Sequence, residues 1–241
     1  MLKIHSYETM SANDGPGLRT VFFLQGCNFR CQYCHNPDTQ ECDGRGQLMS
    51  DDEIIKVLKK NMVYYGDEGG VTFSGGEALL QAENLLKVMR RIKQELQLSI
   101  AVDTNGSIMQ EKAKEVLKEA DLVIFDLKHI DEKKHLVLTG KSNKWVKEGI
   151  SWRESHKKSF WMRYVLVPGV TDEEKDLRAW ANYVSQFKYL KRVEIVPYHT
   201  LGLDKYKKLN WKYELEGVRA AKLTDVEKAK QIMNLPWSEY I

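Results

Sequence analysis

RTVFFLQGCNFRCQYC, residues 19–34, joins a run rich in β-branched and aromatic residues to a loop that carries three cysteines. The run Arg19–Leu24 has the composition of a buried β-strand, because such side chains pack well on a pleated surface. Cys27, Cys31 and Cys34 follow it with the spacing C-x3-C-x2-C. The stretch therefore predicts a strand whose carboxyl end opens into a metal-binding loop.

Similar runs recur along the chain, with helical patterns between most of them. This alternation predicts parallel strands joined by helical crossovers, which is an α/β fold. Several runs are continuously apolar, as strands are when both faces of a sheet are covered. The further expected strands are Gly70–Phe73, Ser99–Val102, Leu122–Phe125, Phe160–Leu166 and Val193–Val196.

The expected crossover helices have recognisable starts and apolar faces. Ser50 and Glu53 form a capping-box pattern before an apolar run. Residues 78–94 and 110–119 carry apolar side chains three to four positions apart, which is typical of a helix packed on one face. The run Thr171–Glu174 indicates another helix start.

Polar clusters stand at the ends of most of the expected strands. In a parallel barrel the carboxyl ends of all strands share one face, so we expect these clusters to converge on a single site. Cys27 follows the first strand and Arg163 lies inside the fifth. The other clusters are Ser74–Glu77, Asp103–Gly106, Asp126–Lys128 and Pro197–His199.

Length and composition exclude several classes of protein. Hydrophobic residues at 42% and charged residues at 29% are ordinary for a globular protein. No apolar run approaches the roughly 18 residues of a membrane-spanning helix, and Met1–Met10 lacks a signal-peptide core, so we expect a cytoplasmic protein with no membrane partner. The net charge of +3 is too small to favour nucleic acid. With 241 residues and no linker, we expect a single domain, 1–241.

All four cysteines fall within Cys27–Cys42, and this clustering favours a metal over disulfides. Soft thiolates at short spacing select an iron–sulfur cluster, zinc or copper(I). Three thiolates leave one iron of a cubane without a protein ligand, and a catalytic centre needs such an open position. Two alternatives stay open here. One is a structural zinc site completed by His35 or Cys42, and the other is a closed cluster with Cys42 as its fourth ligand.

The motif after the first strand, followed by Ser74–Glu77 after the second, resembles the radical S-adenosylmethionine (SAM) superfamily. Within it the chain resembles the glycyl-radical activases of the pyruvate formate-lyase type, from about Ile4 to Val218. It lacks the ferredoxin-like insert of other activases. The segments that carry the resemblance are Asn13–Arg19, Phe22–Cys27, Tyr33–Asn36, Asp103–Gly106, Asp126–Lys128, Arg163–Tyr164, Val167–Gly169 and Pro197–His199.

The resemblance implies a partial (β/α)6 TIM-like barrel of the radical SAM type. It implies a [4Fe-4S] cluster on Cys27, Cys31 and Cys34, with SAM on the open iron. Reductive cleavage of SAM would then yield a 5′-deoxyadenosyl radical, which takes a hydrogen from a glycine Cα of a partner. That partner would be a glycyl-radical enzyme such as pyruvate formate-lyase, presenting its glycine loop, and a flavodoxin or ferredoxin type protein would donate the electron.

The resemblance also implies roles for individual residues. Gly75 and Gly76 would allow close backbone approach, with Glu77 near the SAM amino group. Arg163 would pair with the SAM carboxylate, and Asp14 would contact the partner's glycine loop. The expected SAM-binding residues are Tyr33, Cys34, His35, Gly75, Gly76, Glu77, Asp103, Thr104, Asp126, Leu127, Lys128, Arg163 and His199.

Two neighbouring carboxylates at adjacent strand ends, Asp103 and Asp126, need a counter-charge. Lys128 could supply it. The resemblance suggests a sodium or potassium ion instead, held by Asp103, Thr104, Asp126 and the SAM carboxylate.

Three functions remain open from the sequence: an activase of a protein glycine, a radical SAM enzyme that acts on a small molecule, and a non-enzymatic metal-binding module. The run Asp14–Gly17 and the Lys-rich tail Lys205–Tyr213 favour a protein partner. Packing of Trp211 and Tyr213 on the barrel is the alternative for that tail. Cys42 has no assigned role.

Overall fold

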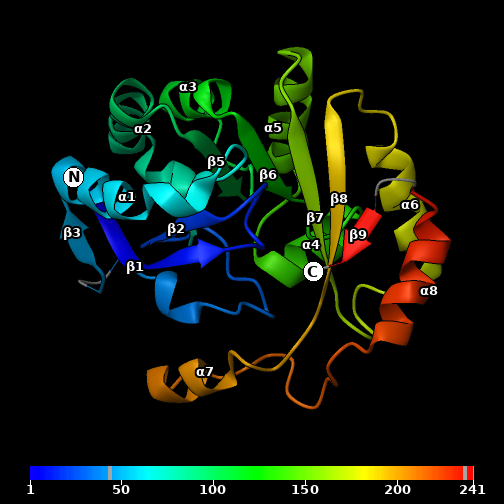
Figure 1. Cartoon of the computed structure of the whole chain (residues 1–241). Coiled ribbons are helices and arrows are strands. Elements are labelled where there is room, and N and C mark those ends of the chain that lie inside the picture. The colour runs from blue at the N-terminus through cyan, green and yellow to red at the C-terminus, as the bar shows by residue number, and fades with distance from the viewer. Residues whose placement is uncertain (43–44, 236–237, 241) are drawn as a thin grey trace. The chain divides into compact units, whose positions relative to one another are not determined.

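A computed structural model describes residues 1–42, 45–235 and 238–240 (Figure 1). The chain divides into two compact units. The first unit comprises Met1–Asn28 and Thr39–Ile124, and the second comprises Phe29–Asp38 and Phe125–Ile241. The single domain expected over residues 1–241 stays a prediction. Its last residue, Ile241, lies outside the described residues.

The first unit is built on strands in the order β3-β1-β2-β4-β5. β1 pairs antiparallel with β2 and β3, whereas β2, β4 and β5 run parallel. The register aligns Leu24 with Gly75, so β2 and β4 end side by side. The bounds are β1 Leu2–Ser11, β2 Arg19–Leu24, β3 Gln47–Met49, β4 Gly70–Gly75 and β5 Ser99–Thr104.

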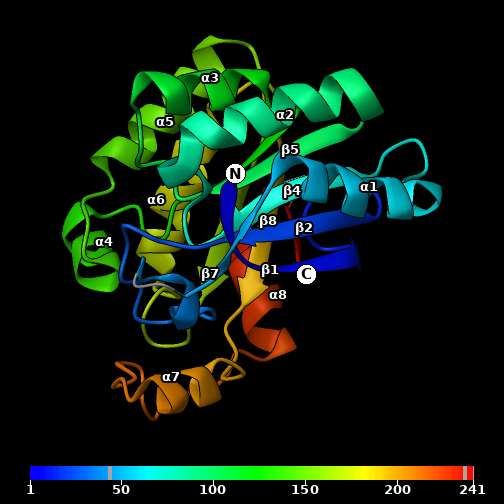
Figure 2. The same ribbon diagram turned by 90° about the vertical axis from the view of Figure 1, so that its left-hand side faces the viewer.

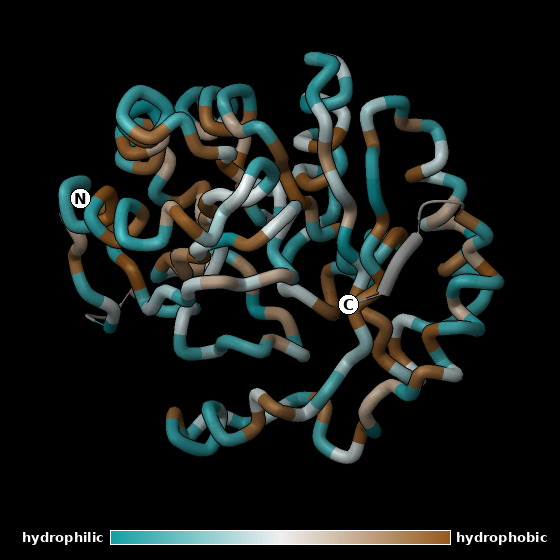
Figure 3. Tube along the Cα trace, in the orientation of Figure 1, coloured by the Kyte–Doolittle hydropathy of each residue, from teal (hydrophilic) through white to brown (hydrophobic). Residues whose placement is uncertain are grey.

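Amphipathic helices accompany these strands. α2 and α3 pack side by side, as Figures 1 and 2 show, and hydrophobic and hydrophilic residues alternate along both (Figure 3). The predicted capping box is confirmed, because the Glu53 carboxylate accepts from the Ser50 amide at 2.7 Å and the Ser50 hydroxyl accepts from the Glu53 amide at 3.3 Å. The helices are α1 Asp51–Tyr65, η2 Ala78–Gln81, α2 Ala82–Leu96 and α3 Glu111–Glu119.

The second unit contains the parallel strands β7, β8 and β9 in that order. Its core includes Trp180, which is fully buried, contacts the Tyr164 ring at 5.1 Å between centroids and donates from Nε1 to the Leu127 carbonyl at 3.0 Å. The strands are β7 Phe160–Leu166, β8 Leu190–Pro197 and β9 Ser238–Tyr240. The helices are α4 Glu132–Thr139, α5 Lys144–Ser155, α6 Glu174–Val184, α7 Leu203–Leu209 and α8 Leu223–Met233.

Two elements belong to the boundary between the units. β6 (Leu122–Asp126) begins in the first unit and ends in the second, and the short 3-10 helix η1 (Pro37–Thr39) lies where the chain returns to the first unit. Among the described residues, none of the helices has both the length and the apolar composition that crossing a membrane requires.

Every strand that the sequence predicted is present, and β2 and β7 have the predicted bounds. The helix expected over residues 78–94 is instead two elements, η2 and α2. β1, which the sequence did not reveal, exposes most of its middle residues and carries polar side chains there, so it lacks the apolar run of a buried strand.

Candidate active site

A buried carboxylate joins the ends of two neighbouring strands in the first unit. Glu77, just after β4, is fully buried. One of its oxygens accepts from the Thr104 hydroxyl at 2.6 Å and the Leu79 amide at 2.9 Å, and the other accepts from the Asn105 amide at 2.7 Å. Burial raises the pKa of Glu77 to about 7, against the effect of these donors. The carboxylate therefore holds the segment after β4 against the segment after β5.

Amide and hydroxyl side chains tie the cysteine loop to the same place. The Asn105 amide donates to Asn28 at 2.9 Å, Asn28 donates to the Ser107 hydroxyl at 2.8 Å, and that hydroxyl donates back to Asn105 at 2.7 Å. This closed ring places Asn28, and with it the adjacent Cys27, beside the end of β5. Ser74 also donates to Asp103 at 3.1 Å, so the polar clusters after β2, β4 and β5 do converge.

The glycine pair after β4 is required by backbone contacts. Gly75 has φ +111, and a Cβ there would lie 2.2 Å from the Leu24 nitrogen. A Cβ on Gly76 would lie 2.1 Å from the Gly26 carbonyl oxygen. No side chain fits at these distances, so the sequence Gly-Gly lets β4 end directly against the chain that leads into Cys27.

In the second unit the loop with Cys31 and Cys34 is attached to the end of α4. The amide of Arg30 donates to the Thr139 carbonyl at 2.8 Å, and the amide of Gln32 donates to the Leu138 carbonyl at 2.9 Å. Tyr33 packs in a buried apolar cluster with Leu138, Val167, Tyr198 and Leu215. Burial raises the pKa of Tyr33, and its buried hydroxyl finds no hydrogen-bond partner within residues 1–42, 45–235 and 238–240.

Asp126 and Lys128, at the end of β6, form a largely buried ion pair. Their charged atoms lie 2.7 Å apart, and their side chains are 17% and 12% exposed. The Lys128 ammonium also lies 5.7 Å from the centre of the Tyr33 ring. The second oxygen of Asp126, Oδ1, is buried and has no hydrogen-bond partner among the residues that the structure describes. A buried acceptor with free lone pairs fits a cation or a polar ligand group, as expected at a cofactor site.

Arg163 on β7 is paired with a carboxylate that the sequence analysis missed. Its guanidinium lies 2.9 Å from Glu194, which is 1% exposed, and Arg192 lies 3.4 Å from the same carboxylate. Glu194 is the direct neighbour of Arg163 in the register of β7 and β8. The alternation of residues along the two strands could have revealed this pair, since residues opposite each other in parallel strands share a face.

The segment after Cys34 packs against the chain that follows β8. The rings of His35 and His199 meet edge to face at 4.7 Å. Partial desolvation, together with His199 and Lys205 nearby, lowers the pKa of His35. Lys205 donates to Asn36 at 2.6 Å. The two predicted histidines therefore do lie together.

The tail after α7 also packs on the second unit. The hydroxyls of Tyr213 and Tyr198 lie 2.7 Å apart, and the Tyr213 ring contacts Tyr206 at 4.8 Å. Packing of Tyr213, the alternative to a partner-binding role, is therefore what the structure shows.

Asp14 lies away from the strand ends. Its backbone carbonyl accepts from the Thr72 hydroxyl in the middle of β4 at 2.7 Å, and its carboxylate accepts from the Ser11 hydroxyl at 2.6 Å. Thr72 precedes Gly75 by three residues, roughly 10 Å along a strand. The predicted contact of Asp14 with the partner's glycine loop stays a prediction.

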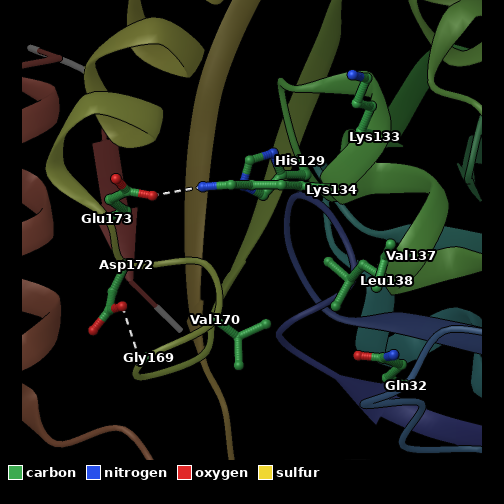
Figure 4. Close-up of a pocket in the computed structure, with 10 residues that line it drawn as sticks. All are labelled: Gln32, His129, Lys133, Lys134, Val137, Leu138, Gly169, Val170, Asp172 and Glu173. Carbon is green, nitrogen blue, oxygen red and sulfur yellow. Dashed lines mark hydrogen bonds and ion pairs between the residues drawn. The ribbon is translucent and has the colours of Figure 1, made fainter.

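The second unit has a cavity of about 420 Å³. Some of its lining residues are sequence neighbours of predicted site residues, but none of the predicted site residues is among those that line it. Figure 4 shows Lys134 extending from α4 to Glu173, with which it forms an ion pair at 2.5 Å. Gln32, which follows Cys31, and His129, which follows Lys128, line the cavity together with Lys133, Val137, Leu138, Gly169, Val170 and Asp172.

Cys27, Cys31 and Cys34 are partly buried and Cys42 is exposed. Cys42 lies close to Gly26, since a Cβ on Gly26 would be 2.7 Å from the Cys42 sulfur. Across residues 1–42, 45–235 and 238–240, no three His, Cys, Asp or Glu side chains are grouped as ligands of one metal ion. The assignment of cluster ligands therefore rests on the sequence motif, and the soft thiolates fit an iron–sulfur cluster.

Comparisons with known proteins agree with these observations. Residues 21–181 match the family model of the radical SAM superfamily. A pyruvate formate-lyase-activating enzyme from Clostridium pasteurianum is 40% identical over 96% of this chain and 95% of its own length. One from Streptococcus mutans is 38% identical over 96% of this chain and 90% of its own length.

Solved structures share the fold. A domain of a pyruvate-formate lyase-activating enzyme from Bacteroides vulgatus is 24% identical, with a TM-score of 0.59 over 72% of this chain and 99% of that one. Streptococcus suis SuiB bound to its precursor peptide SuiA is 13% identical, with a TM-score of 0.69 over 92% of this chain and 48% of that one.

The predicted fold class, a partial (β/α)6 TIM-like barrel of the radical SAM type, is confirmed. With the family come its cofactors, a [4Fe-4S] cluster and SAM. The chain is a radical SAM enzyme, and by its full-length similarity it belongs to the family of pyruvate formate-lyase-activating enzymes.

Proposed function

We propose that this chain activates a glycyl-radical enzyme, and that its partner is pyruvate formate-lyase. The observation that carries the proposal is the similarity at 38–40% identity over nearly the whole length of relatives that bear this activity in their names. When bound, the cluster supplies the electron that cleaves SAM to methionine and a 5′-deoxyadenosyl radical, which takes a hydrogen atom from a glycine Cα of the partner. A flavodoxin or ferredoxin type protein is the proposed electron donor.

The chain's own residues hold the cofactors. Cys27, Cys31 and Cys34 are the proposed cluster ligands, and their number leaves one iron free for SAM. Gly75 and Gly76 offer partly exposed backbone close to the cysteine loop. We propose that Glu77 lies near the SAM amino group, and that the three hydrogen bonds it accepts hold that backbone in place.

Charged residues of the second unit orient the sulfonium nucleotide in this proposal. Arg163, with its guanidinium held by Glu194, would pair with the SAM carboxylate. Asp126 has a buried oxygen without a hydrogen-bond partner among the described residues, and this oxygen fits a donor group of SAM or a monovalent cation. Tyr33, Cys34, His35, Leu127, Lys128 and His199 complete the proposed SAM site.

A sodium or potassium ion between Asp103, Thr104, Asp126 and the SAM carboxylate remains part of the proposal. Hard oxygen ligands of this kind suit an alkali cation, and the free oxygen of Asp126 supports the position. Activity assays in sodium, potassium and tetramethylammonium buffers test it. Equal rates in all three would remove the ion from the proposal.

The proposed function is tested by anaerobic reconstitution with iron and sulfide, followed by reduction with SAM and pyruvate formate-lyase. We expect a glycyl-radical doublet in the electron paramagnetic resonance spectrum. Cys31→Ser should abolish the doublet, whereas Cys42→Ser, the matched control, should retain it. Deoxyadenosine formed without any protein radical would indicate a small-molecule substrate instead.

A further inference from the structure

The cavity of the second unit has no role in the proposed chemistry. Its volume of about 420 Å³ lies within the range of small-molecule sites. Its lining comes from the second unit alone, and none of the proposed SAM-binding residues is part of it. Two of its residues nevertheless adjoin that site along the chain, because Gln32 follows Cys31 and His129 follows Lys128. The cavity is therefore a candidate for a second ligand.

Apolar side chains form two opposite walls of the cavity. Figure 4 shows Leu138 of α4 on one side of it and Val170, from the loop after β7, on the other, with Val137 beside Leu138. Leu138 belongs to the buried apolar cluster around Tyr33, and Val170 and Cys31 pack against that cluster. A flat ring that lies between two such walls buries both of its apolar faces.

The charged side chains that face the space between these walls are paired with one another. The Lys134 ammonium lies 2.5 Å from a carboxylate oxygen of Glu173 and 2.5 Å from one of Asp176. Lys133 and Asp172 extend away from the space between the walls, as Figure 4 shows. A charged ligand would lose its hydration there without gaining an unpaired opposite charge from the described lining. The cavity therefore favours an uncharged ligand.

Two uncharged polar groups of the lining are available to such a ligand. The side-chain amide of Gln32 forms no hydrogen bond with any described residue, which leaves both its donor and its acceptor for a ligand. His129 is 1% exposed, and its Nδ1 accepts from the Asp131 amide at 3.0 Å, so Nε2 is the donor of the neutral ring. This Nε2 is buried, lies 3.4 Å from Asp176, and makes no hydrogen bond in the described part of the chain.

We propose that the cavity is a nucleoside site, separate from the SAM site, which binds an uncharged adenine nucleoside. A glutamine amide forms two hydrogen bonds to the edge of adenine, donating to N7 and accepting from the N6 amino group. The adenine ring lies between Leu138 and Val170 with its edge on Gln32, and a ribose oxygen accepts from Nε2 of His129.

The proposed function supplies a ligand of this kind. Reductive cleavage of SAM releases methionine and removes the charged sulfonium, and the hydrogen atom taken from the partner's glycine completes 5′-deoxyadenosine, which is uncharged. The inference rests on the proposed function in this respect, and it gives the product a place to bind outside the SAM site.

The first test measures the binding of adenosine to the reconstituted, unreduced holoenzyme at saturating SAM, by anaerobic equilibrium dialysis. Without a reductant SAM is not cleaved, and it keeps its own site filled. We expect a stoichiometric amount of adenosine to bind beside SAM, and 5′-deoxyadenosine to compete with it. Complete displacement of adenosine by SAM would overturn the proposal, as would a failure of 5′-deoxyadenosine to compete.

A second test changes the group that reads the adenine edge. Inosine has an oxygen in place of the N6 amino group, so its edge offers only acceptors to Gln32. At saturating SAM we expect wild type to bind adenosine about tenfold more tightly than inosine, and Gln32→Leu to bind both equally. Gln186→Leu, at an exposed glutamine, is the matched control and should keep the preference. Equal affinities of wild type for the two nucleosides would overturn the assignment.

A third test covers the case in which Gln32→Leu, beside Cys31, does not assemble the cluster. Val170→Trp places a large ring in the space between the walls, so adenosine binding at saturating SAM should be lost while the SAM affinity is unchanged. Val63→Trp, at an exposed valine of α1, is the matched control and should retain both. Adenosine binding that survives in Val170→Trp would overturn the proposal. A parallel loss of SAM binding would do so too, because the cavity would then be part of the SAM site.

The outcomes separate this inference from the proposed function. If the wild-type protein forms no glycyl radical on pyruvate formate-lyase, the proposed function fails, while adenosine binding at saturating SAM still decides whether the cavity is a nucleoside site. If the radical forms but SAM displaces all of the adenosine, the inference alone fails.

Discussion

The carboxylates at the ends of β4 and β6, one in each unit, differ in how completely they are paired. In the first unit, Glu77 accepts three hydrogen bonds, and Asn28, Asn105 and Ser107 form a closed ring. In the second unit, Asp126 keeps a buried oxygen and Tyr33 a buried hydroxyl that have no hydrogen-bond partner in the described part of the chain. Buried polar groups are normally satisfied, so the exceptions mark where a ligand can bind. We infer that the first unit supplies a rigid frame, and that the second keeps polar atoms available for the cofactor.

The largest expected effect on stability comes from removing the Glu77 carboxylate, which joins the segments after β4 and β5. Glu77→Ala removes the acceptor of three donors, two of them backbone amides, and we expect it to lower the free energy of unfolding by about 3 kcal/mol. Anaerobic urea unfolding measures the change. Glu119→Ala is the control; Glu119 is partly exposed and paired with Arg90 on the surface, and its loss should cost less than about 1 kcal/mol.

The next effect is a pH dependence of stability that originates in the same residue. Burial raises the pKa of Glu77 to about 7 from 4.5, so the folded protein binds a proton that the unfolded chain releases. The contribution is fully present below pH 4.5 and is lost as the pH rises through 7. We expect the unfolding free energy to fall by roughly 2 kcal/mol from pH 5.5 to 8. Glu77→Gln should remove this slope, and an unchanged slope would contradict the assignment.

The next prediction concerns Asp126 in the second unit and its effect on SAM binding. Asp126→Asn retains the size of the side chain but replaces a charged acceptor that is partly free. We expect the dissociation constant for SAM to rise about tenfold, the effect of one charge-assisted hydrogen bond, measured by anaerobic calorimetry on the reconstituted protein. Asp172→Asn serves as control, because Asp172 is partly exposed and its carboxylate accepts from the Gly169 amide. Equal SAM affinities of the two variants would show that Asp126 is not at the SAM site.

The smallest expected effect on stability comes from opening the hydrogen-bonded ring of Asn28, Asn105 and Ser107. Ser107→Ala removes the hydroxyl that donates to Asn105 and accepts from Asn28, and we expect a loss of about 1 kcal/mol in unfolding free energy. Ser185→Ala on the surface should be close to neutral. If SAM affinity fell while stability did not, the ring would belong to the ligand site rather than to the frame.

Much of the fold was predictable because its parallel strands are buried on both faces. Such strands appear as continuous apolar runs, and β2 and β7 were located to the residue. β1 was not, because only part of it is covered, and its exposed residues include Glu8 and Tyr7. The short strands β3 and β9 have three residues each, too few for a periodic pattern.

The candidate site was predictable only in part. The motifs indicated which residues are chemically unusual, and the structure brings many of them together within each unit. The partners of these residues were missed: Glu194 beside Arg163, the ring of Asn28, Asn105 and Ser107, and Arg19 beneath the loop at Asp14. Asparagine, serine and a single arginine are common on any protein surface. Their residue types therefore predict no role unless the pairing of the strands is known.

The sequence by itself determined the kind of chemistry, because thiolate spacing and glycine placement are local properties that a few neighbouring residues specify. Only the tertiary structure decided which polar groups are satisfied. Glu77 belongs to the family motif Ser74–Glu77, yet its carboxylate accepts hydrogen bonds from within the protein. Asp126, in contrast, has one oxygen without a hydrogen-bond partner among the described residues. The physical reason is that pairing and burial depend on residues far apart in the chain, and these meet only when the strands are packed.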